Sequence, residues 1–318
     1  MTRPAAAPSC TAAAVGLDPG RTAAWLRAYH GALAVRLVHQ ATRLGWADTG
    51  AGRAYGVRSL HPRAVWAARV AVEQPDLVAD GGLPVSDLLA ASRTPSAAPE
   101  HVGADRDEPW ARWGVATVDA QVTQLWPQPP MRLAAAPLGS RRTNVDRALA
   151  VLYRVWPEAA TELRLQVRAV VHVEGGGFRS ATADEVFGAV FVGERYNDSV
   201  PAAFEMLVHE SAHLALVLRR RFQPFVTNGA DLAGHPLRPD PRPVSGTVHA
   251  AYALARMATG LALWRDEGGA PAEVARRAEE SLANLVGAVA VLREKAAWTD
   301  EGRAWFARLE QHTEEVAP

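Results

Sequence analysis

The chain has very little cysteine and no excess of charge of either sign. Cys10 is its only cysteine, which excludes an intramolecular disulfide and a metal site built on a cysteine cluster. Lysine and arginine together number 34, as do aspartate and glutamate, so the formal net charge is +0. A general binder of nucleic acid or of membrane surfaces needs a basic excess, and the balance argues against both.

Long hydrophobic runs are also missing. No apolar stretch approaches the roughly 20 residues that span a bilayer, and residues 1–20 lack the continuous apolar segment of a secretory signal. We therefore expect a soluble, cytoplasmic protein with no nucleic-acid or membrane partner. The 318 residues, of which 48% are hydrophobic and 21% charged, are sufficient for a sizeable core.

Composition and pattern predict three regions. Residues 1–20 are rich in alanine and proline, and we expect them to be disordered. Residues 21–140 are predicted to be a helical N-terminal region, and residues 141–318 a catalytic region that binds metal. The pattern favours a mainly α protein with a small β-sheet next to the metal-site helix, which is an α+β fold.

The spacing of apolar residues predicts the individual elements. Helices are expected at residues 21–44, 62–74, 83–91, from 143, at 247–265, and from about 270 and 299. Valine-rich stretches predict strands within residues 165–178 and 186–194. Loops are expected where proline, serine or charge accumulate, at residues 92–110, 126–140 and 235–246.

The segment EMLVHESAHLAL carries an HExxH motif formed by His209, Glu210 and His213. Residues four apart share one face of a helix, so both imidazoles can reach the same divalent metal ion. Ser199 is the expected N-cap of this helix. Only five side chains between residues 202 and 218 are polar, and a helix that apolar is expected to be buried. The motif thus predicts a metal site on a zincin-like HExxH helix.

The third metal ligand is open. A metzincin needs Gly at 216 and His at 219, where this chain has Leu216 and Arg219, so that class is excluded on spacing. A gluzincin-type peptidase takes a glutamate from a following helix, and none occurs between Leu214 and Asp266. The remaining candidates are Asp231, His235, Asp240 and His249. His249 is favoured because a predicted helix holds it rigidly, with Asp240 as the alternative.

Two chemistries suit such a site. In a zinc peptidase, Glu210 would activate the metal-bound water. An iron(II) oxygenase needs three protein ligands on one face and a cation for the far carboxylate of a 2-oxo acid. Arginine matches a carboxylate best because its planar fork donates two parallel hydrogen bonds. The segment HPLRPDPRP supplies Arg238 and Arg242 between prolines that restrict the backbone.

Two blocks of sequence in series carry a resemblance to a known family. MLVHESAHLALV, followed by HPLRPDPRPVSGTVHAAYALARM, resembles the HExxH-motif peptide-modification family of ribosomal peptide natural-product biosynthesis. Its members are described as 2-oxoglutarate- and iron-dependent peptide β-hydroxylases. The resemblance covers residues 187–257, less than a third of the chain. HExxH followed by DPRPxxG and HxxY is much more specific than HExxH alone.

The resemblance implies a 2-oxoglutarate-dependent iron dioxygenase that β-hydroxylates a residue of a ribosomally made precursor peptide. The metal ligands implied are His209, His213 and His249. The cosubstrate, 2-oxoglutarate, is expected at Asp240 and Arg242, with Arg238 nearby. Glu210 and Arg242 are the expected catalytic residues. A radical-SAM maturase or another peptide-modifying enzyme is the candidate partner.

Two alternatives stay open. A zinc-dependent HExxH metallopeptidase would bind Zn instead of Fe(II) and use Glu210 as its base. A non-enzymatic peptide-binding module would use the metal only to fix its fold. Structural zinc takes four protein ligands and leaves no open position, and the two motif histidines with His249 and Asp240 are the candidates for such a set.

Overall fold

The computed structural model describes residues 15–43, 61–74, 98–106, 108–124, 129–135, 138–175, 177–235 and 238–316. The helix predicted at residues 83–91 lies outside these ranges, as does most of the N-terminal segment expected to be disordered. Within them the protein is mainly helical with small sheets, which confirms the coarse prediction of a mainly α protein with some β-structure. None of the described helices has both the length and the apolar character that a membrane span requires.

The chain divides into two compact units that alternate along the sequence. Unit 1 consists of Met1–Thr22, Ala148–Glu162 and Leu207–Pro318, and unit 2 of Ala23–Arg147 and Leu163–Met206. The boundary predicted between residues 140 and 141 falls inside unit 2. The HExxH motif belongs to unit 1.

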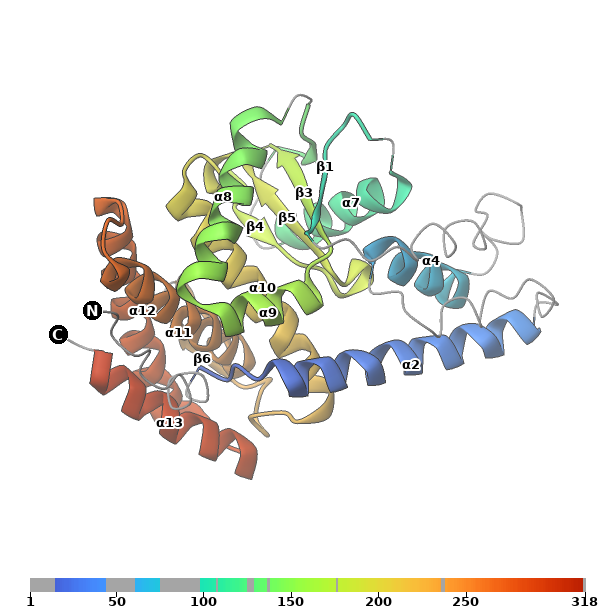
Figure 1. Cartoon of the computed structure of the whole chain (residues 1–318). Helices are drawn as coiled ribbons and strands as arrows, with labels where there is room; N and C mark the ends of the chain where they lie inside the picture. The colour runs from blue at the N-terminus through green and yellow to red at the C-terminus, as the bar shows by residue number, and fades with distance from the viewer. Residues whose placement is uncertain are drawn as a thin grey trace. The chain divides into compact units, whose positions relative to one another are not determined.

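Unit 2 contains a mixed sheet with the order β1-β3-β5-β4 (Figure 1). The strands β1 (Glu100–Val102), β3 (Ala169–Glu174) and β5 (Ala189–Gly193) are parallel, while β2 (Arg132–Leu133) pairs antiparallel with β3 and β4 (Ser180–Ala181) with β5. All of β5 and all but the last residue of β3 are buried. Parallel strands covered on both faces need continuous apolar runs, and the sequence predicted these two strands from their valines.

The helices of unit 2 include one that the sequence pattern did not predict. It is α7 (Pro109–Thr123), which packs against α4 (Pro62–Glu73), a predicted helix. A side chain at Gly114 of α7 would place a Cβ 2.5 Å from the ring of Phe191, so glycine allows the helix to approach β5 closely. The strand β1 also lies within a predicted loop, which shows that residues 92–110 are not loop throughout.

Unit 1 contains three C-terminal helices, all of them predicted. They are α11 (Val244–Glu267), α12 (Ala272–Lys295) and α13 (Asp300–Val316), with α11 packed along α12 and α12 against α13 (Figure 1). Between α10 (Val200–Phe222) and α11 the chain forms a two-stranded sheet that contacts both α11 and α12.

The loop predicted at residues 235–246 is wrong in its greater part. The strands β6 (Leu232–His235) and β7 (Arg238–Pro243) pair antiparallel, with Ala233 opposite Arg242 and a register shift before His235. Proline usually marks a loop because it lacks an N–H, but an edge strand tolerates it wherever that N–H would face away from the neighbouring strand. The rest of the segment begins α11.

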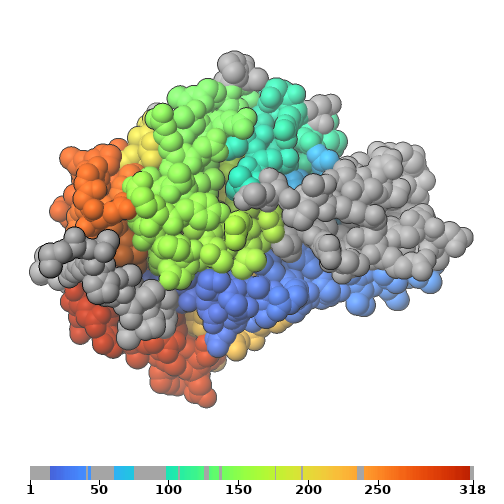
Figure 2. All heavy atoms as spheres, in the orientation of Figure 1, coloured from blue at the N-terminus to red at the C-terminus, as the bar shows by residue number. Residues whose placement is uncertain are grey.

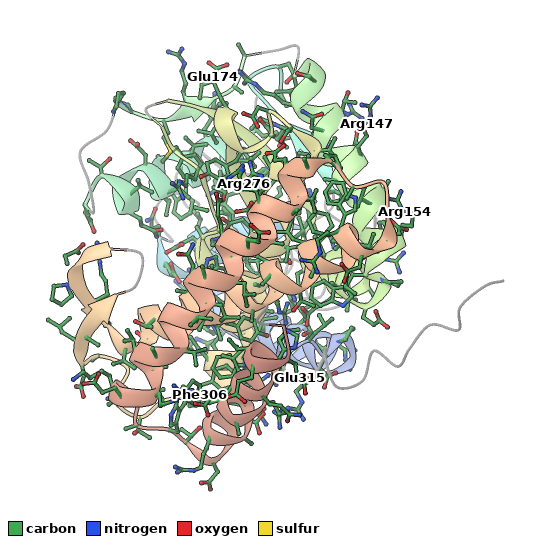
Figure 3. The ribbon with its side chains drawn as sticks, turned by 90° about the vertical axis from the view of Figure 1, so that its left-hand side faces the viewer. Arg147, Arg154, Glu174, Arg276, Phe306 and Glu315 are labelled. Carbon is green, nitrogen blue, oxygen red and sulfur yellow. The ribbon has the colours of Figure 1, made fainter. Side chains whose placement is uncertain are left out.

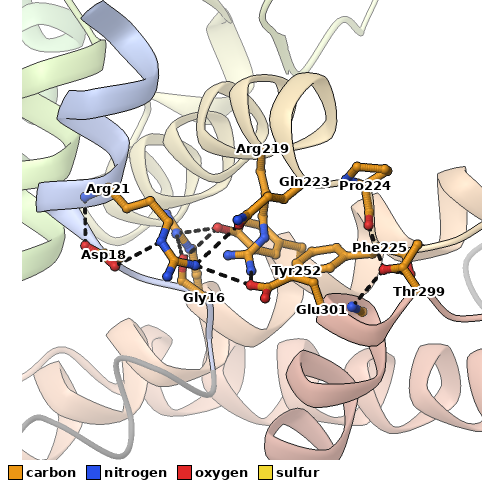
Figure 4. A network of polar contacts seen from close by, with 12 residues as sticks. Gly16, Asp18, Arg21, Arg219, Gln223, Pro224, Phe225, Tyr252, Thr299 and Glu301 are labelled. Carbon is orange, nitrogen blue, oxygen red and sulfur yellow. Dashed lines mark hydrogen bonds and ion pairs between the residues drawn. The ribbon is translucent and has the colours of Figure 1, made fainter. Parts of the chain in front are cut away.

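A polar network holds the C-terminal end of α10 within unit 1 (Figure 4). The guanidinium of Arg219 donates to Glu301 of α13 at 2.5 Å and lies 4.3 Å from the centre of the Phe225 ring. The hydroxyl of Tyr252 on α11 donates to the carbonyl of Gly16 at 2.9 Å. Arg219 therefore ties the end of the motif helix to α13.

Candidate metal centre

The helix that carries the motif begins where the sequence predicts. The Oγ of Ser199 accepts a hydrogen bond from the backbone N–H of Ala202 at 3.2 Å, which satisfies one of the donors left open in the first turn. Pro201, at the second helical position, has no N–H to satisfy. The helix then continues without a break to Phe222. The predicted N-cap is confirmed.

The two motif histidines converge. The Nε2 of His213 lies 2.9 Å from the Nε2 of His209, and the rings stand edge to face with their centres 4.4 Å apart. Burial lowers the pKa of His213 to about 4, so its imidazole is neutral at pH 7. Neutral imidazole is the form that binds metal. An ion about 2.1 Å from both Nε2 atoms is compatible with their separation, so this pair fits the predicted metal.

The other nitrogen of His209 has a neighbour on α11. The Nδ1 of His209 lies 3.2 Å from the Sδ of Met257. A thioether is a weak acceptor, so the contact favours a proton on Nδ1 and leaves the lone pair on Nε2, directed at His213. Metal-ligating histidines usually have their second nitrogen oriented by a hydrogen-bond partner, and Met257 provides a weak version of that contact.

Glu210 lies next to the pair and is almost fully buried, with 1% of its side chain exposed. One of its carboxylate oxygens is 3.9 Å from the Nε2 of His209, a side chain that is itself 36% exposed. The carboxylate is therefore close to the point at which both Nε2 atoms are directed. From there it can act on whatever binds at that point, as the HExxH pattern predicts.

His249 lies beside the pair, but its Nε2 is engaged elsewhere. Its ring centre is 5.5 Å from that of His213, and its Nε2 accepts a hydrogen bond from the Nη1 of Arg220 at 2.8 Å. Burial lowers the pKa of His249 to about 3, with further lowering by His213 in its protonated form and by Arg220. The favoured third ligand is thus a neutral imidazole within the cluster, bonded to a guanidinium.

Arg220 is the residue that the sequence reasoning missed. It is exposed, on α10, two helical turns after His213, so it shares the face of the helix that carries the motif histidines. The seven-residue spacing from His213 was available in the sequence. Its partner His249 is 29 residues further along, and their contact depends on how α11 packs against α10.

The described residues bring together two of the three predicted ligands. Among them, no group of three or more histidine, cysteine, aspartate or glutamate side chains is arranged to hold a metal ion. Of the other candidates, Asp231 accepts a hydrogen bond from the Nδ2 of Asn228 at 3.1 Å. His235 lies in β6, and its side chain is outside the described part of the structure.

The predicted cosubstrate residues lie on β7. Arg242 pairs with Asp240, Nη2 to Oδ2, at 2.8 Å. Its Nε is buried and has no hydrogen-bond partner among the described residues. Arg242 thus keeps donors beyond those that Asp240 takes, which suits a second carboxylate. Arg238 begins the same strand, and its side chain lies outside the described residues.

Unit 2 contains a second histidine pair that no sequence pattern indicated. The Nδ1 of His101 on β1 lies 2.9 Å from the Nε2 of His172 on β3. At the far ends, His101 Nε2 is 3.0 Å from Asp146 and His172 Nδ1 is 3.0 Å from the amide nitrogen of Asn197. Asp146 lies on α8 (Gly139–Val155), which is green in Figure 2, and its side chain is half exposed. His172, by contrast, is fully buried.

Comparison with known proteins assigns no family. No protein-family model matches the chain. No curated protein matches it. The resemblance to HExxH-motif peptide-modification enzymes therefore depends on the residues of the two sequence blocks alone.

Proposed function

We propose that the protein is a 2-oxoglutarate- and Fe(II)-dependent oxygenase that β-hydroxylates a residue of a ribosomally made precursor peptide. The observation that supports this most is the convergence of His209 and His213 beside a cation. Their Nε2 atoms are 2.9 Å apart, and the next polar side chain on that face of α10 is Arg220. A cation beside the metal favours an anionic ligand such as an oxo acid.

Each residue of the candidate site has a distinct proposed role. His213 offers a neutral imidazole, and the ring of His209 is oriented by the contact of its Nδ1 with Met257. When bound there, Fe(II) supplies the redox chemistry that couples decarboxylation of the oxo acid to hydroxylation of a C–H bond. The buried carboxylate of Glu210 lies beside the pair and positions groups bound to the same point. Arg242, held by Asp240, keeps donors for the far carboxylate of the oxo acid.

A zinc metallopeptidase is the second candidate, and the position of Glu210 favours it. A buried carboxylate 3.9 Å from a ligand nitrogen suits a base that activates water. Against it stands the absence of any glutamate between Leu214 and Asp266. The non-enzymatic module needs four protein ligands that leave no open position, which is more than either of the other two candidates requires.

The test is a spectroscopic titration under exclusion of oxygen. The full chain is mixed with Fe(II) and then with 2-oxoglutarate, and the visible metal-to-ligand charge-transfer band is recorded. We expect the band in the parent protein and its loss in His213→Ala. Arg242→Ala should weaken it. Arg276→Met is the matched control, because Arg276 is an exposed residue of α12 (Figure 3). Its ion pair with Glu280 lies along the same helix.

The outcome separates the candidates. A band, followed on admission of oxygen by stoichiometric succinate release and a peptide heavier by one oxygen atom, supports the oxygenase. Absence of the band, with tightly bound zinc and peptide hydrolysis abolished by Glu210→Gln, would instead establish the metallopeptidase. A bound metal ion whose spectrum changes with neither oxo acid nor peptide, and which supports no reaction, would favour the non-enzymatic peptide-binding module.

A further inference from the structure

One contact at the candidate metal centre conflicts with the predicted set of ligands. A neutral imidazole has a single lone pair in the plane of its ring. In His249 that lone pair is on Nε2, because this nitrogen accepts from the Nη1 of Arg220 at 2.8 Å. Its Nδ1 then carries the proton, and neither nitrogen can bind a metal ion. His249 nevertheless lies next to His213, with ring centres 5.5 Å apart.

We propose that Arg220 withholds His249 from the metal until a carboxylate-bearing ligand takes over the guanidinium, so that ligand binding completes the metal site. The inference deepens the proposed function and rests on it, because it presupposes that His209 and His213 hold a metal. Arg220 acts through His249 and is a positioning residue. The ligand is a small molecule or peptide that carries a free carboxylate.

The relative strengths of the hydrogen bonds give the exchange its direction. A hydrogen bond from arginine to a neutral imidazole is charged on one side only, whereas arginine and a carboxylate form two parallel bonds between opposite charges. Arg220 is exposed, so a carboxylate from solvent can reach it without any rearrangement of the core. Once Arg220 has turned to the carboxylate, the lone pair of His249 is available.

Electrostatics acts in the same direction. A divalent cation at His209 and His213 and the guanidinium of Arg220 repel each other, because Arg220 donates to His249 and the ring of His249 lies beside that of His213. A carboxylate on Arg220 cancels that repulsion. The affinities for metal and carboxylate are therefore coupled, and each must raise the other by the same factor. Typical couplings of this kind are about fivefold or more.

The test measures Co(II) affinity of the full chain by titration of its visible spectrum, with and without glutarate. Glutarate has two carboxylates but lacks the 2-oxo group, so it cannot chelate the metal as an oxo acid does. We expect glutarate to tighten Co(II) binding about fivefold or more. Arg220→Met should bind Co(II) more tightly without glutarate and no longer respond to it. Arg276→Met should behave as the parent.

A double-mutant cycle separates release of His249 from simple loss of positive charge. If Arg220 acts through His249, Arg220→Met tightens Co(II) binding in the parent but not in a His249→Ala background. Equal tightening in both backgrounds would overturn the proposal. A second arm replaces glutarate by N-acetylglutamate amide, whose single carboxylate resembles that of a peptide. If only this compound tightens Co(II) binding, the carboxylate belongs to the peptide. If only glutarate does so, it belongs to the oxo acid.

A metal-free measurement distinguishes this inference from the proposed function. The ¹⁵N resonance of His249 Nε2, assigned with His249→Ala, should shift when glutarate is added without metal. Co(II) binding that ignores glutarate and Arg220→Met would disprove the exchange and leave the oxygenase proposal standing. Absence of Co(II) binding under every condition would remove both.

Discussion

Two pairs of histidines in this protein have ring nitrogens 2.9 Å apart, yet their hydrogen bonds differ. In unit 2, His101 and His172 are linked from Nδ1 to Nε2, with their rings stacked at 23°. In unit 1, His209 and His213 meet Nε2 to Nε2, with their rings at 83°. The separation is the same, and what differs is which nitrogens face each other.

The difference is one of donors and acceptors. In the unit 2 pair each ring donates once and accepts once: Asn197 donates to His172, which donates to His101, which donates to Asp146. That chain is complete with both rings neutral. In the motif pair only one of the two facing nitrogens can donate, so a cation at the common point would use both lone pairs. A short distance between histidines is therefore weak evidence of a metal site unless their outer nitrogens are also known.

The sharpest way to break this comparison is to remove one ring from each pair. His213→Ala should weaken Co(II) binding by more than the roughly 100-fold that loss of an outer contact to a ligand can cost. His101→Ala should leave Co(II) affinity unchanged, because both of its nitrogens already have partners within unit 2. Calorimetric titration of both variants measures the contrast. Equal losses of Co(II) affinity in the two variants would contradict the proposal that the metal binds at His209 and His213.

A second prediction concerns stability and its dependence on pH. His172→Leu should lower the free energy of unfolding by about 2 kcal/mol at pH 7, because it leaves polar groups of His101 and Asn197 buried without their partner. Burial, with the charges of His101, Arg141 and Arg142, lowers the pKa of His172 from 6.5 to about 3.

The sign of the pH effect follows from that shift. The unfolded chain binds a proton at His172 near pH 6.5, and the folded chain binds it only near pH 3. The contribution of His172 to the free energy of unfolding is therefore complete above pH 6.5 and is lost as the pH falls toward 3. Between pH 6.5 and 5, the urea-unfolding free energy of the parent should fall more steeply than that of His172→Leu. The difference in slope should grow as the pH falls and approach about 1.4 kcal/mol per pH unit near pH 5. Parallel slopes would show that His172 does not titrate in this way.

The smallest predicted effect concerns the ring nitrogen of His209 that faces away from His213. Met257→Leu keeps an apolar side chain of similar size but removes the thioether beside His209 Nδ1. Because a thioether is a weak acceptor, Co(II) affinity should fall less than tenfold, below the usual range for stronger outer partners. A larger fall would mean that Met257 orients His209 as firmly as a carboxylate does.

Local signals in the sequence predicted much of the fold. Helices with apolar stripes, such as α2 (Pro19–Arg43) and α11, lie close to their predicted ranges, as do the valine-rich β3 and β5. The short strands β1, β2 and β4 have two or three residues each and leave no periodic trace. They exist because β3 and β5 offer edges to pair with. The strand β7 was hidden by its prolines.

In the candidate site, too, local spacing predicted some residues, while contacts between separate elements could not be predicted. His209 and His213 are predictable because one helix carries both at a spacing that brings their rings together. The contact of His249 with Arg220 joins two helices, and no local pattern encodes how those helices pack. The second histidine pair was invisible for a similar reason, since β1 meets β3 across 71 residues of chain.

The alternating prolines of β7 restrict how a peptide can bind. Pro239, Pro241 and Pro243 all lack an N–H, and they alternate with Arg238, Asp240 and Arg242 along the strand. In the regular part of the pairing, where Ala233 lies opposite Arg242, the N–H groups directed at β6 come from non-proline residues, and the proline position faces the outer edge of the hairpin. A further strand laid along this edge would find too few hydrogen-bond donors to pair with. The edge is therefore poorly suited to binding an extended peptide by strand addition.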